Sequence, residues 1–349
     1  MKSTAKVFLA LVSLFYGFML VSCGGASAKN ISAASANSPS AGSGLVAFVT
    51  NSQNASLSVI DTKTNNVTDS VPVGMPWPDG PNPSYPSAVA ITPDGTRAYI
   101  ADGDTSVWVM NTATNKIVTG IVIGPAGTAP YQLAVTPNGK TVYVTTYLSV
   151  VAIDTATNSV AGTISLGKYP YGIVITPDGA RAYVSNQTGK YIWVIDTKTN
   201  TVAATIQTPK LTSGIAISPD GGRLYVTDGD TGFLVVDTKT NALLATVPTQ
   251  EDDLGYLAIS PDGRLAYIAV FDGLLVVDTS TNNTVAKVPV FNDYENLLGV
   301  AVTPDGSDVY VTSGNTNTIS VIATATNSVV ASVNSPVTPS GVAISTVPR

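Results

Sequence analysis

The sequence predicts an all-β protein, a seven-bladed β-propeller of four-stranded antiparallel blades whose ring is closed by the C-terminal strand completing the first blade. Three observations predict this fold. A tetrapeptide like Thr-Pro-Asp-Gly alternates along the chain with a pentapeptide like Asp-Thr-x-Thr-Asn, and short runs rich in Val, Ile, Thr and Tyr separate them. The pair of markers returns roughly every forty to fifty residues, which is the length of one propeller blade.

Residues 1–22 at the N-terminus are predicted to be a signal peptide. Lys2 and Lys6 give this segment a positive start, and its apolar run 7–21 is short for a membrane-spanning helix. Leu20-Val21-Ser22-Cys23 resembles the lipobox of bacterial lipoproteins, which implies that Cys23 becomes the lipidated first residue of the mature protein. Ala26-Ser27-Ala28 offers an alternative cleavage site that would release a soluble protein.

Residues 23–44 are predicted to be a lipidated Cys23 followed by a flexible tether, and residues 45–349 the propeller. The tether is mostly Gly, Ser, Ala and Asn, so it has too little apolar surface to offset the entropy of ordering. Cys23 is the only cysteine of the chain, so the propeller has no disulfide and must be stabilised by packing.

The first marker is predicted to form the turn between the first two strands of a blade. Its proline presets the first turn dihedral, its Asp accepts local backbone hydrogen bonds, and its Gly supplies a positive φ. It occurs at 92–95, 136–139, 176–179, 218–221, 260–263 and 303–306.

The second marker is predicted to form the turn between the last two strands. Its Asp and Thr side chains hold the turn, and its Asn tolerates the left-handed backbone position at the end. It occurs at 61–65, 111–115, 154–158, 196–200, 237–241, 278–282 and 323–327.

Between the markers lie four predicted strands, here named a, b, c and d from the channel outward. In one repeat they are 171–176, 181–186, 191–196 and 202–207; the first three are almost entirely apolar, and the last alternates as an edge strand does. The folded part begins on a b strand near Leu45 and ends on an unpartnered a strand at 341–345. We therefore expect the last strand to complete the first blade and hide two sheet edges.

The motifs at the b strands carry a family resemblance. Phe48-Val49-Thr50-Asn51 and Tyr183-Val184-Ser185-Asn186, each followed by a run like Val-Ile-Asp-Thr, resemble the YVTN-type β-propeller repeat. The resemblance covers essentially all of residues 45–349. It implies the fold and says little about function, because propellers carry many unrelated activities.

Candidate binding residues are expected on one face of the ring. The a-to-b and c-to-d turns share the turn face, whereas the b-to-c and d-to-a loops share the opposite face, here called the loop face. The turns are short and regular, so binding is expected among the irregular loops. The candidates are Trp77, Asp79, Tyr85, Tyr131, Lys168, Tyr169, Tyr171, Glu251, Asp252, Asp253, Asp293, Tyr294 and Glu295.

Charge also distinguishes the loop face. The chain has 17 basic and 23 acidic residues, and the acidic excess is expected on the loop face, opposed there by Lys168, Lys190 and Lys210. A negative field disfavours nucleic acid and attracts cations or basic partners. Candidate ligands for Ca²⁺ have the oxygen chemistry that this ion prefers, although short acidic turns explain them equally well; they are Asp102, Asp104, Asp228 and Asp230. No other metal or cofactor is expected.

The residue inventory argues against most enzyme chemistry. The chain has no histidine, so it lacks the commonest general base, and no thiol remains after Cys23. We therefore predict a non-catalytic, extracytoplasmic binding protein with an acidic, aromatic loop face around the channel. The alternative is a carboxylate-dependent hydrolase of a sugar or lactone at the channel mouth, using acids such as Glu251 and Glu295.

Partners and location follow from the same features. We expect a monomer that binds a cell-envelope protein or a small polar or cationic ligand, and that touches the membrane through its lipid anchor only. Gly24 and Gly25 after Cys23 lack the acidic residue that retains lipoproteins at the inner membrane in many Gram-negative bacteria, so the outer membrane or the cell surface is expected. The alternative is a periplasmic or secreted soluble protein.

Overall fold

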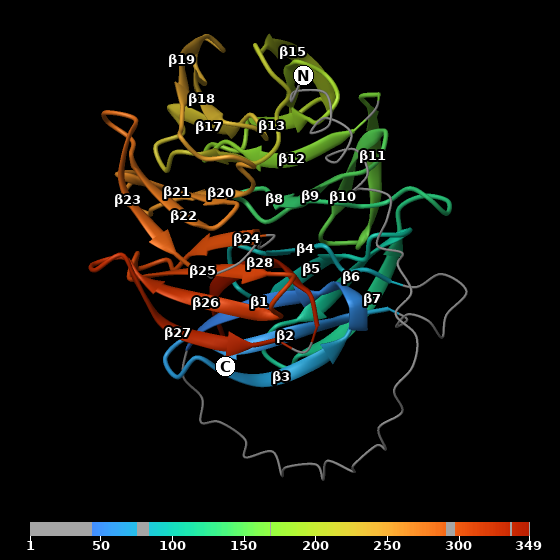
Figure 1. Cartoon of the computed structure of the whole chain (residues 1–349). Coiled ribbons are helices and arrows are strands. Elements are labelled where there is room, and N and C mark those ends of the chain that lie inside the picture. The colour runs from blue at the N-terminus through green and yellow to red at the C-terminus, as the bar shows by residue number, and fades with distance from the viewer. Residues whose placement is uncertain (1–43, 75–83, 168, 291–296, 336, 349) are drawn as a thin grey trace, which may run out of the picture. The chain divides into compact units, whose positions relative to one another are not determined.

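The computed structural model describes residues 44–74, 84–167, 169–290, 297–335 and 337–348, and these form seven four-stranded antiparallel sheets. The only helical turn among them is Ser52–Asn54. The seven sheets are the blades of a β-propeller (Figure 1). Blades are numbered from the first, which contains the start of the described chain.

In every blade the strands follow the order a, b, c, d from the channel outward. The a strands of blades 1 to 7 are β28 (Pro339–Val347), β4 (Ala88–Ile91), β8 (Leu133–Val135), β12 (Pro170–Ile175), β16 (Ile215–Ile217), β20 (Leu257–Ile259) and β24 (Leu297–Val302). The b strands are β1 (Gly44–Asn51), β5 (Arg97–Ala101), β9 (Thr141–Thr145), β13 (Arg181–Asn186), β17 (Arg223–Thr227), β21 (Leu265–Val270) and β25 (Asp308–Ser313).

The outer half of each blade is built in the same way. The c strands are β2 (Ser56–Asp61), β6 (Ser106–Asn111), β10 (Ser149–Asp154), β14 (Tyr191–Asp196), β18 (Gly232–Asp237), β22 (Gly273–Asp278) and β26 (Thr318–Ala323). The d strands are β3 (Asn66–Pro72), β7 (Lys116–Val122), β11 (Ser159–Ser165), β15 (Thr201–Gln207), β19 (Leu243–Pro248), β23 (Asn283–Pro289) and β27 (Ser328–Asn334).

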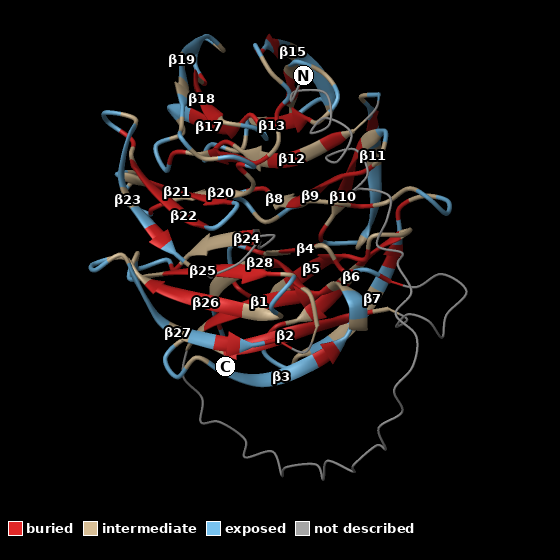
Figure 2. Ribbon diagram, in the orientation of Figure 1, coloured by how far each residue is buried: buried red, intermediate tan, exposed pale blue. Residues whose placement is uncertain are grey.

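Burial explains why the inner and outer strands differ in composition. The b and c strands are buried between neighbouring blades, whereas the d strands expose most of their residues (Figure 2). The largest fully buried side chains include a tyrosine at the same place in six b strands: Tyr99, Tyr143, Tyr183, Tyr225, Tyr267 and Tyr310. Every d strand carries a register shift, and such bulges make an exposed sheet edge a poorer template for other chains.

The ring closes as predicted. β28 pairs antiparallel with β1 from Gly44↔Val347 to Asn51↔Pro339, so the last strand of the chain is the a strand of the first blade. β28 also packs against β24 of blade 7 and β4 of blade 2. Figure 1 shows the two coloured ends of the chain, β1 and β28, side by side in this sheet.

Both repeated turns adopt the predicted conformations. The turn glycines have positive φ, as at Gly95 with φ 70°, and the Asn that ends each second marker has a φ between 49° and 59°. Within a blade the two turns are joined, because the Thr of the second marker donates a hydrogen bond to the carbonyl of the turn glycine, as Thr155 does to Gly139 at 2.6 Å. The repeated sequence therefore specifies one rigid end of each blade.

The same markers join neighbouring blades. The Tyr99 hydroxyl donates to Oδ1 of Asn158 in the next blade at 2.9 Å, and Tyr143 donates to Asn200 at 2.6 Å. At the other end of the b strand, Thr145 Oγ1 donates to the carbonyl of Tyr171 at 2.7 Å. Where the b strand carries them, the tyrosine and the Thr or Ser two residues later thus form bonds to the next blade at opposite ends of the strand.

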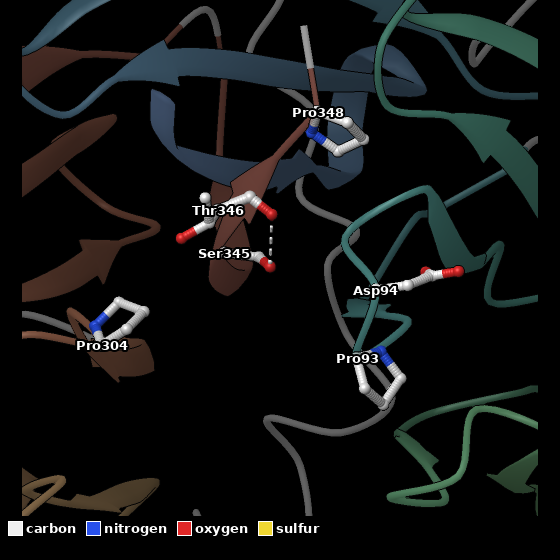
Figure 3. Close-up of a pocket in the computed structure, with 6 residues that line it drawn as sticks. All are labelled: Pro93, Asp94, Pro304, Ser345, Thr346 and Pro348. Atoms are coloured by element: carbon white, nitrogen blue, oxygen red, sulfur yellow. Dashed lines mark hydrogen bonds between the residues drawn. The ribbon is translucent and has the colours of Figure 1, made fainter. Parts of the chain in front are cut away.

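Blade 1 departs from this pattern on the turn face. Its a and b strands come from opposite ends of the chain, so no a-to-b turn joins them. A cavity of about 460 Å³ lies at this place (Figure 3), lined by Pro93, Asp94, Pro304, Ser345, Thr346 and Pro348. It is on the face opposite the predicted binding loops.

Candidate functional site

Several predicted site residues lie outside the described part of the chain: Cys23, Trp77, Asp79, Lys168, Asp293, Tyr294 and Glu295. The remaining candidates fall into a tyrosine group, an acidic group and the aspartates of the b-to-c loops.

Three tyrosines from three blades meet at the loop-face end of the channel. Tyr131 precedes β8, Tyr171 is the second residue of β12, and Tyr256 precedes β20. The ring centroids of Tyr131 and Tyr171 are 6.4 Å apart, and those of Tyr171 and Tyr256 are 5.7 Å apart. The hydroxyls of Tyr171 and Tyr256 are hydrogen-bonded at 2.5 Å. The two residues belong to blades 4 and 6, which are separated in the ring by blade 5. These residues are called the channel tyrosines below.

A second tyrosine pair stands beside the channel tyrosines. The Tyr147 hydroxyl donates to Tyr169 at 3.0 Å, and the two rings meet edge to face with centroids 4.7 Å apart. Tyr169 stands two residues before Tyr171, and its N–H donates to the Tyr147 carbonyl at 3.0 Å. Burial, and to a lesser extent the neighbouring Tyr147, raise the pKa of Tyr131. The sequence predicted Tyr131, Tyr169 and Tyr171 as site residues, whereas Tyr147 and Tyr256 were not among the predicted ones.

The signal that identifies these tyrosines is a departure from the repeat. Five positions before the Thr or Ser of the first turn, three other blades have Ser87, Ser213 or Ser340, whereas blades 3 and 4 have Tyr131 and Tyr171. One position later, four blades have glycine, where Tyr256 stands in blade 6. A Cβ on one of those glycines, Gly214, would lie 2.3 Å from the Gly255 carbonyl oxygen, so neighbouring blades approach closely here.

The loops leading into the channel share an unusual backbone conformation. Two residues before Tyr131 and Tyr171, Ala129 has φ 49° and Tyr169 has φ 61°; Asp253, before Tyr256, has φ 56°. Residues with a Cβ adopt this left-handed region at a cost of about 1–3 kcal/mol, and such strain concentrates at binding and catalytic sites. The strained positions all precede the residues that face the channel mouth.

The channel tyrosines are uncharged over the physiological range. Burial raises the pKa of Tyr171 well above 10.0, and the adjacent Tyr256 raises it further. Burial also raises the pKa of Tyr256, although its hydrogen bond with Tyr171 acts in the opposite direction. Their side chains are half-buried. The site thus offers neutral phenols and partly accessible aromatic rings.

The acidic loop of blade 6 is partly neutralised by a lysine that sequence analysis did not place on this face. Lys287, near the end of β23, contacts Glu251 at 2.7 Å and Asp272 at 2.8 Å. Burial alone would lower the pKa of Lys287, but the two carboxylates raise it. The expectation that only Lys168, Lys190 and Lys210 oppose the acids was therefore wrong, because it ignored the ends of the d strands. Asp252 and Asp253 are exposed.

Blade 5 has a similar cluster. Lys210 contacts Asp228 at 3.1 Å and Asp230 at 3.3 Å. The hydrogen bond with Asp228 raises the pKa of Lys210. Each of the two lysines thus joins a pair of carboxylates and leaves one negative charge in excess.

The aspartates predicted as calcium candidates cap their own loops. Asp102 Oδ1 accepts the backbone N–H groups of Asp104, Thr105 and Ser106, and its Oδ2 accepts the Trp108 indole at 3.3 Å. Asp228 Oδ1 accepts backbone N–H groups in the same way. In blade 4 the equivalent residue is the neutral Asn186, which caps its loop too. In the described parts of the chain no three acidic residues come together as metal ligands.

Tyr85, the described part of the long loop of blade 2, lies beside the same cap. Its N–H donates to the Asp102 carbonyl at 2.6 Å, and its side chain is 40% exposed. Burial of its hydroxyl raises the pKa of Tyr85.

No family model matches this sequence, and no curated protein does. Among solved structures, a chain of the hydrazine synthase of Kuenenia stuttgartiensis is similar, with 22% identity and a TM-score of 0.67 over 73% of this chain and 88% of that one. The dihydro-heme d1 dehydrogenase NirN in complex with DHE has 16% identity and a TM-score of 0.62, covering 85% and 74%. A functionally unknown protein from Desulfotomaculum acetoxidans DSM 771 has 16% identity and a TM-score of 0.71, covering 87% and 99%.

These similarities establish the seven-bladed propeller, because at such identities the fold is what is shared. Within the described residues, no helix has the length and apolar character needed to cross a bilayer.

Proposed function

We propose that the protein is a non-catalytic, extracytoplasmic binding protein that uses the loop face around the channel. The observation that carries this proposal is the meeting of Tyr131, Tyr171 and Tyr256 from three blades, at positions where other blades have serine or glycine. Aromatic side chains that the repeat does not need for packing, placed on a rigid scaffold, are typical of binding sites.

The alternative, a carboxylate-dependent hydrolase, has less support. Glu251, its described candidate, is engaged in an ion pair through Oε2, which lies 2.7 Å from Lys287 Nζ. Two of the structural neighbours carry enzyme names, but their likeness extends to the fold alone. Turnover of a sugar or lactone panel that is lost in Glu251→Gln would favour the hydrolase over the binding protein.

A lipid anchor on Cys23 would suit this use of the loop face. The propeller begins at Gly44, where β1 leaves the turn face to pair with the end of β28. The proposed location is the outer membrane or the cell surface, with the periplasm as the alternative.

The test is a pull-down from native membranes with the full-length protein, analysed by mass spectrometry. The loop-face variant combines Tyr131→Ser, Tyr171→Ser and Tyr256→Gly, each of which introduces the residue that other blades carry there. A partner captured by the wild type and lost by this variant is the expected result.

The matched control is Asp178→Asn and Asp220→Asn on the turn face, a change that copies the Asn138 of blade 3. Capture by all three proteins alike would contradict the proposal that the channel mouth is the binding surface.

A further inference from the structure

We propose that the channel tyrosines bind an organic cation of the quaternary-ammonium type. This inference deepens the proposed function, since it rests on the loop face being a binding surface and names the chemical class that the surface takes.

The first support is the aromatic composition of the site. Tyr131, Tyr171 and Tyr256 lie in one chain of ring contacts, tilted by 45° and 36° to one another, and are partly exposed at the channel mouth. Tyr147 and Tyr169 extend the aromatic surface beside them. The face of each ring is the negative end of its quadrupole and attracts a cation within about 6 Å. Because the three side chains are partly exposed, they can present such faces without any charged group of their own.

The second support is the charge of the loop face on which the rings lie. Lys210 and Lys287 are each shared by two carboxylates, so both clusters remain negative. The exposed Lys190 adds one positive charge to this face and offsets only one of these carboxylates. Asp252 and Asp253, which lead into Tyr256, are exposed, and in the described part of the chain no lysine or arginine forms an ion pair with them. A negative field of this kind raises the local concentration of cations and opposes anions, while a neutral ligand gains nothing from it.

The chemistry of the rings selects among cations. A primary ammonium is strongly hydrated and needs hydrogen-bond acceptors in exchange for its water. Phenol rings provide few such acceptors, and two of the three channel hydroxyls are already bonded to each other. A quaternary ammonium has no N–H to satisfy and gains from ring faces, which is why aromatic groups recognise choline and methylated lysine.

The experiment compares choline with 3,3-dimethylbutan-1-ol, which has the same shape and no charge. Both are titrated into the full-length protein in a maltoside detergent, with isothermal calorimetry and tyrosine fluorescence as readouts. We expect choline to bind at least about tenfold more tightly than the alcohol. Choline binding should also weaken several-fold between about 20 and 300 mM NaCl, because salt screens the acidic loops. Equal binding of the two probes, or no choline binding up to about 50 mM, would overturn the proposal.

Variants assign the binding to the rings. Tyr171→Ser and Tyr256→Gly introduce residues that other blades already carry, so the fold should persist, and each should weaken choline binding by about tenfold. Tyr256→Phe keeps the ring and loses the hydroxyl, so its affinity should stay within about threefold of wild type. The control is Leu211→Ser, which removes a side chain that is 43% exposed before the a strand of blade 5 and contains no ring.

Wild-type choline affinity in both Tyr171→Ser and Tyr256→Gly would show that the rings do not form the site. The pull-down separates this inference from the function on which it rests. If the loop-face variant loses a partner but the wild-type protein binds no choline, the proposal of a quaternary-ammonium ligand is wrong. The proposal that the loop face is a binding surface then still stands. Choline binding lost in the ring variants supports the cation whatever the pull-down captures.

Discussion

At the tyrosine position of the b strands, blade 1 differs from the other six blades. Six b strands carry a buried tyrosine, and in blade 1 the same position is Phe48. The hydroxyl that would reach Asn115 of blade 2 is thus absent, and among the described residues nothing pairs with the buried Asn115 Oδ1. The Oδ1 atoms of Asn282 and Asn327 are unpaired as well, although the preceding blades carry Tyr225 and Tyr267, so a tyrosine forms this bond at some interfaces only. The corresponding bond between blades 7 and 1, from Tyr310 to Asn65, measures 2.5 Å.

Phe48→Tyr is therefore expected to stabilise the protein by about 1 kcal/mol, because it supplies a donor to a buried acceptor. The measurement is the free energy of unfolding in urea. In the Asn115→Gly background, where the left-handed backbone is retained but the acceptor is gone, the gain should disappear. An equal gain in both backgrounds would mean that the tyrosine acts elsewhere.

A second residue-level prediction concerns acid. The hydrogen bond from the Thr or Ser hydroxyl of the first turn lowers the pKa of Asp178, Asp220 and Asp262 below 3.8. A depressed carboxyl pKa stabilises the fold above the unfolded value of 3.8, and this contribution is lost as the pH falls through the folded pKa.

Asn138 makes the same bonds as these aspartates without titrating. Replacing Asp178, Asp220 and Asp262 by Asn should thus lower the stability at pH 7 slightly, because the charged acceptors are lost, and flatten its decline in the acid range. Urea unfolding from about pH 7 to pH 3 measures this. A decline as steep as that of the wild type would contradict the assignment.

Among the elements, β28 has the largest role in closure. It supplies the a strand of blade 1 and packs against both neighbouring blades. Deleting residues 340–349 should therefore expose the edge of β1 and lower the melting temperature by at least about 5 °C. Deleting only Pro348 and Arg349, which follow the end of β28, is the control. An unchanged melting temperature in the longer deletion would contradict closure through this strand.

Sequence alone predicted the strands and the closure of the ring. Each blade repeats the same turn chemistry, and the first predicted strand of the propeller is a b strand whereas the last is an a strand. It predicted Tyr131 and Tyr171 as loop-face residues, but not their partner Tyr256. Tyr171 and Tyr256 are 85 positions apart and belong to blades that are not neighbours, so only the curvature of the ring brings their hydroxyls together. The position of Lys287 was missed for a related reason: which acids a d strand reaches depends on the packing of adjacent blades.

At the scale of the whole molecule, the ring should tolerate new ends only where a blade remains shared between the two ends of the chain. We consider circular permutants in which a Thr-Pro-Asp-Gly turn joins Ile344 to Leu45 and thereby completes blade 1. A permutant opened between Asp178 and Gly179 again splits one blade, between β12 and β13, so it should retain nearly the stability of the parent.

A second permutant, opened between β15 and β16, begins and ends at a blade boundary, and its ring is closed by side-chain packing alone. It should unfold at lower urea concentration than the first, because no backbone pairing holds its ends together. Equal midpoints for the two permutants would show that strand exchange between the ends is dispensable.

The pairing of β1 with β28 also determines when the first blade can be completed during synthesis. β1 is the first strand of the propeller to be synthesised, and the strand that covers its inner edge is the last. During synthesis the inner edge of the first blade stays unpaired while the other six blades form. The contact that completes this blade joins strands separated by almost the whole sequence of the domain. Such contacts form late and slowly, and an open edge invites wrong pairing while it waits. We therefore expect the nascent chain to depend on chaperones until its final residues emerge, and the finished molecule to need them no longer.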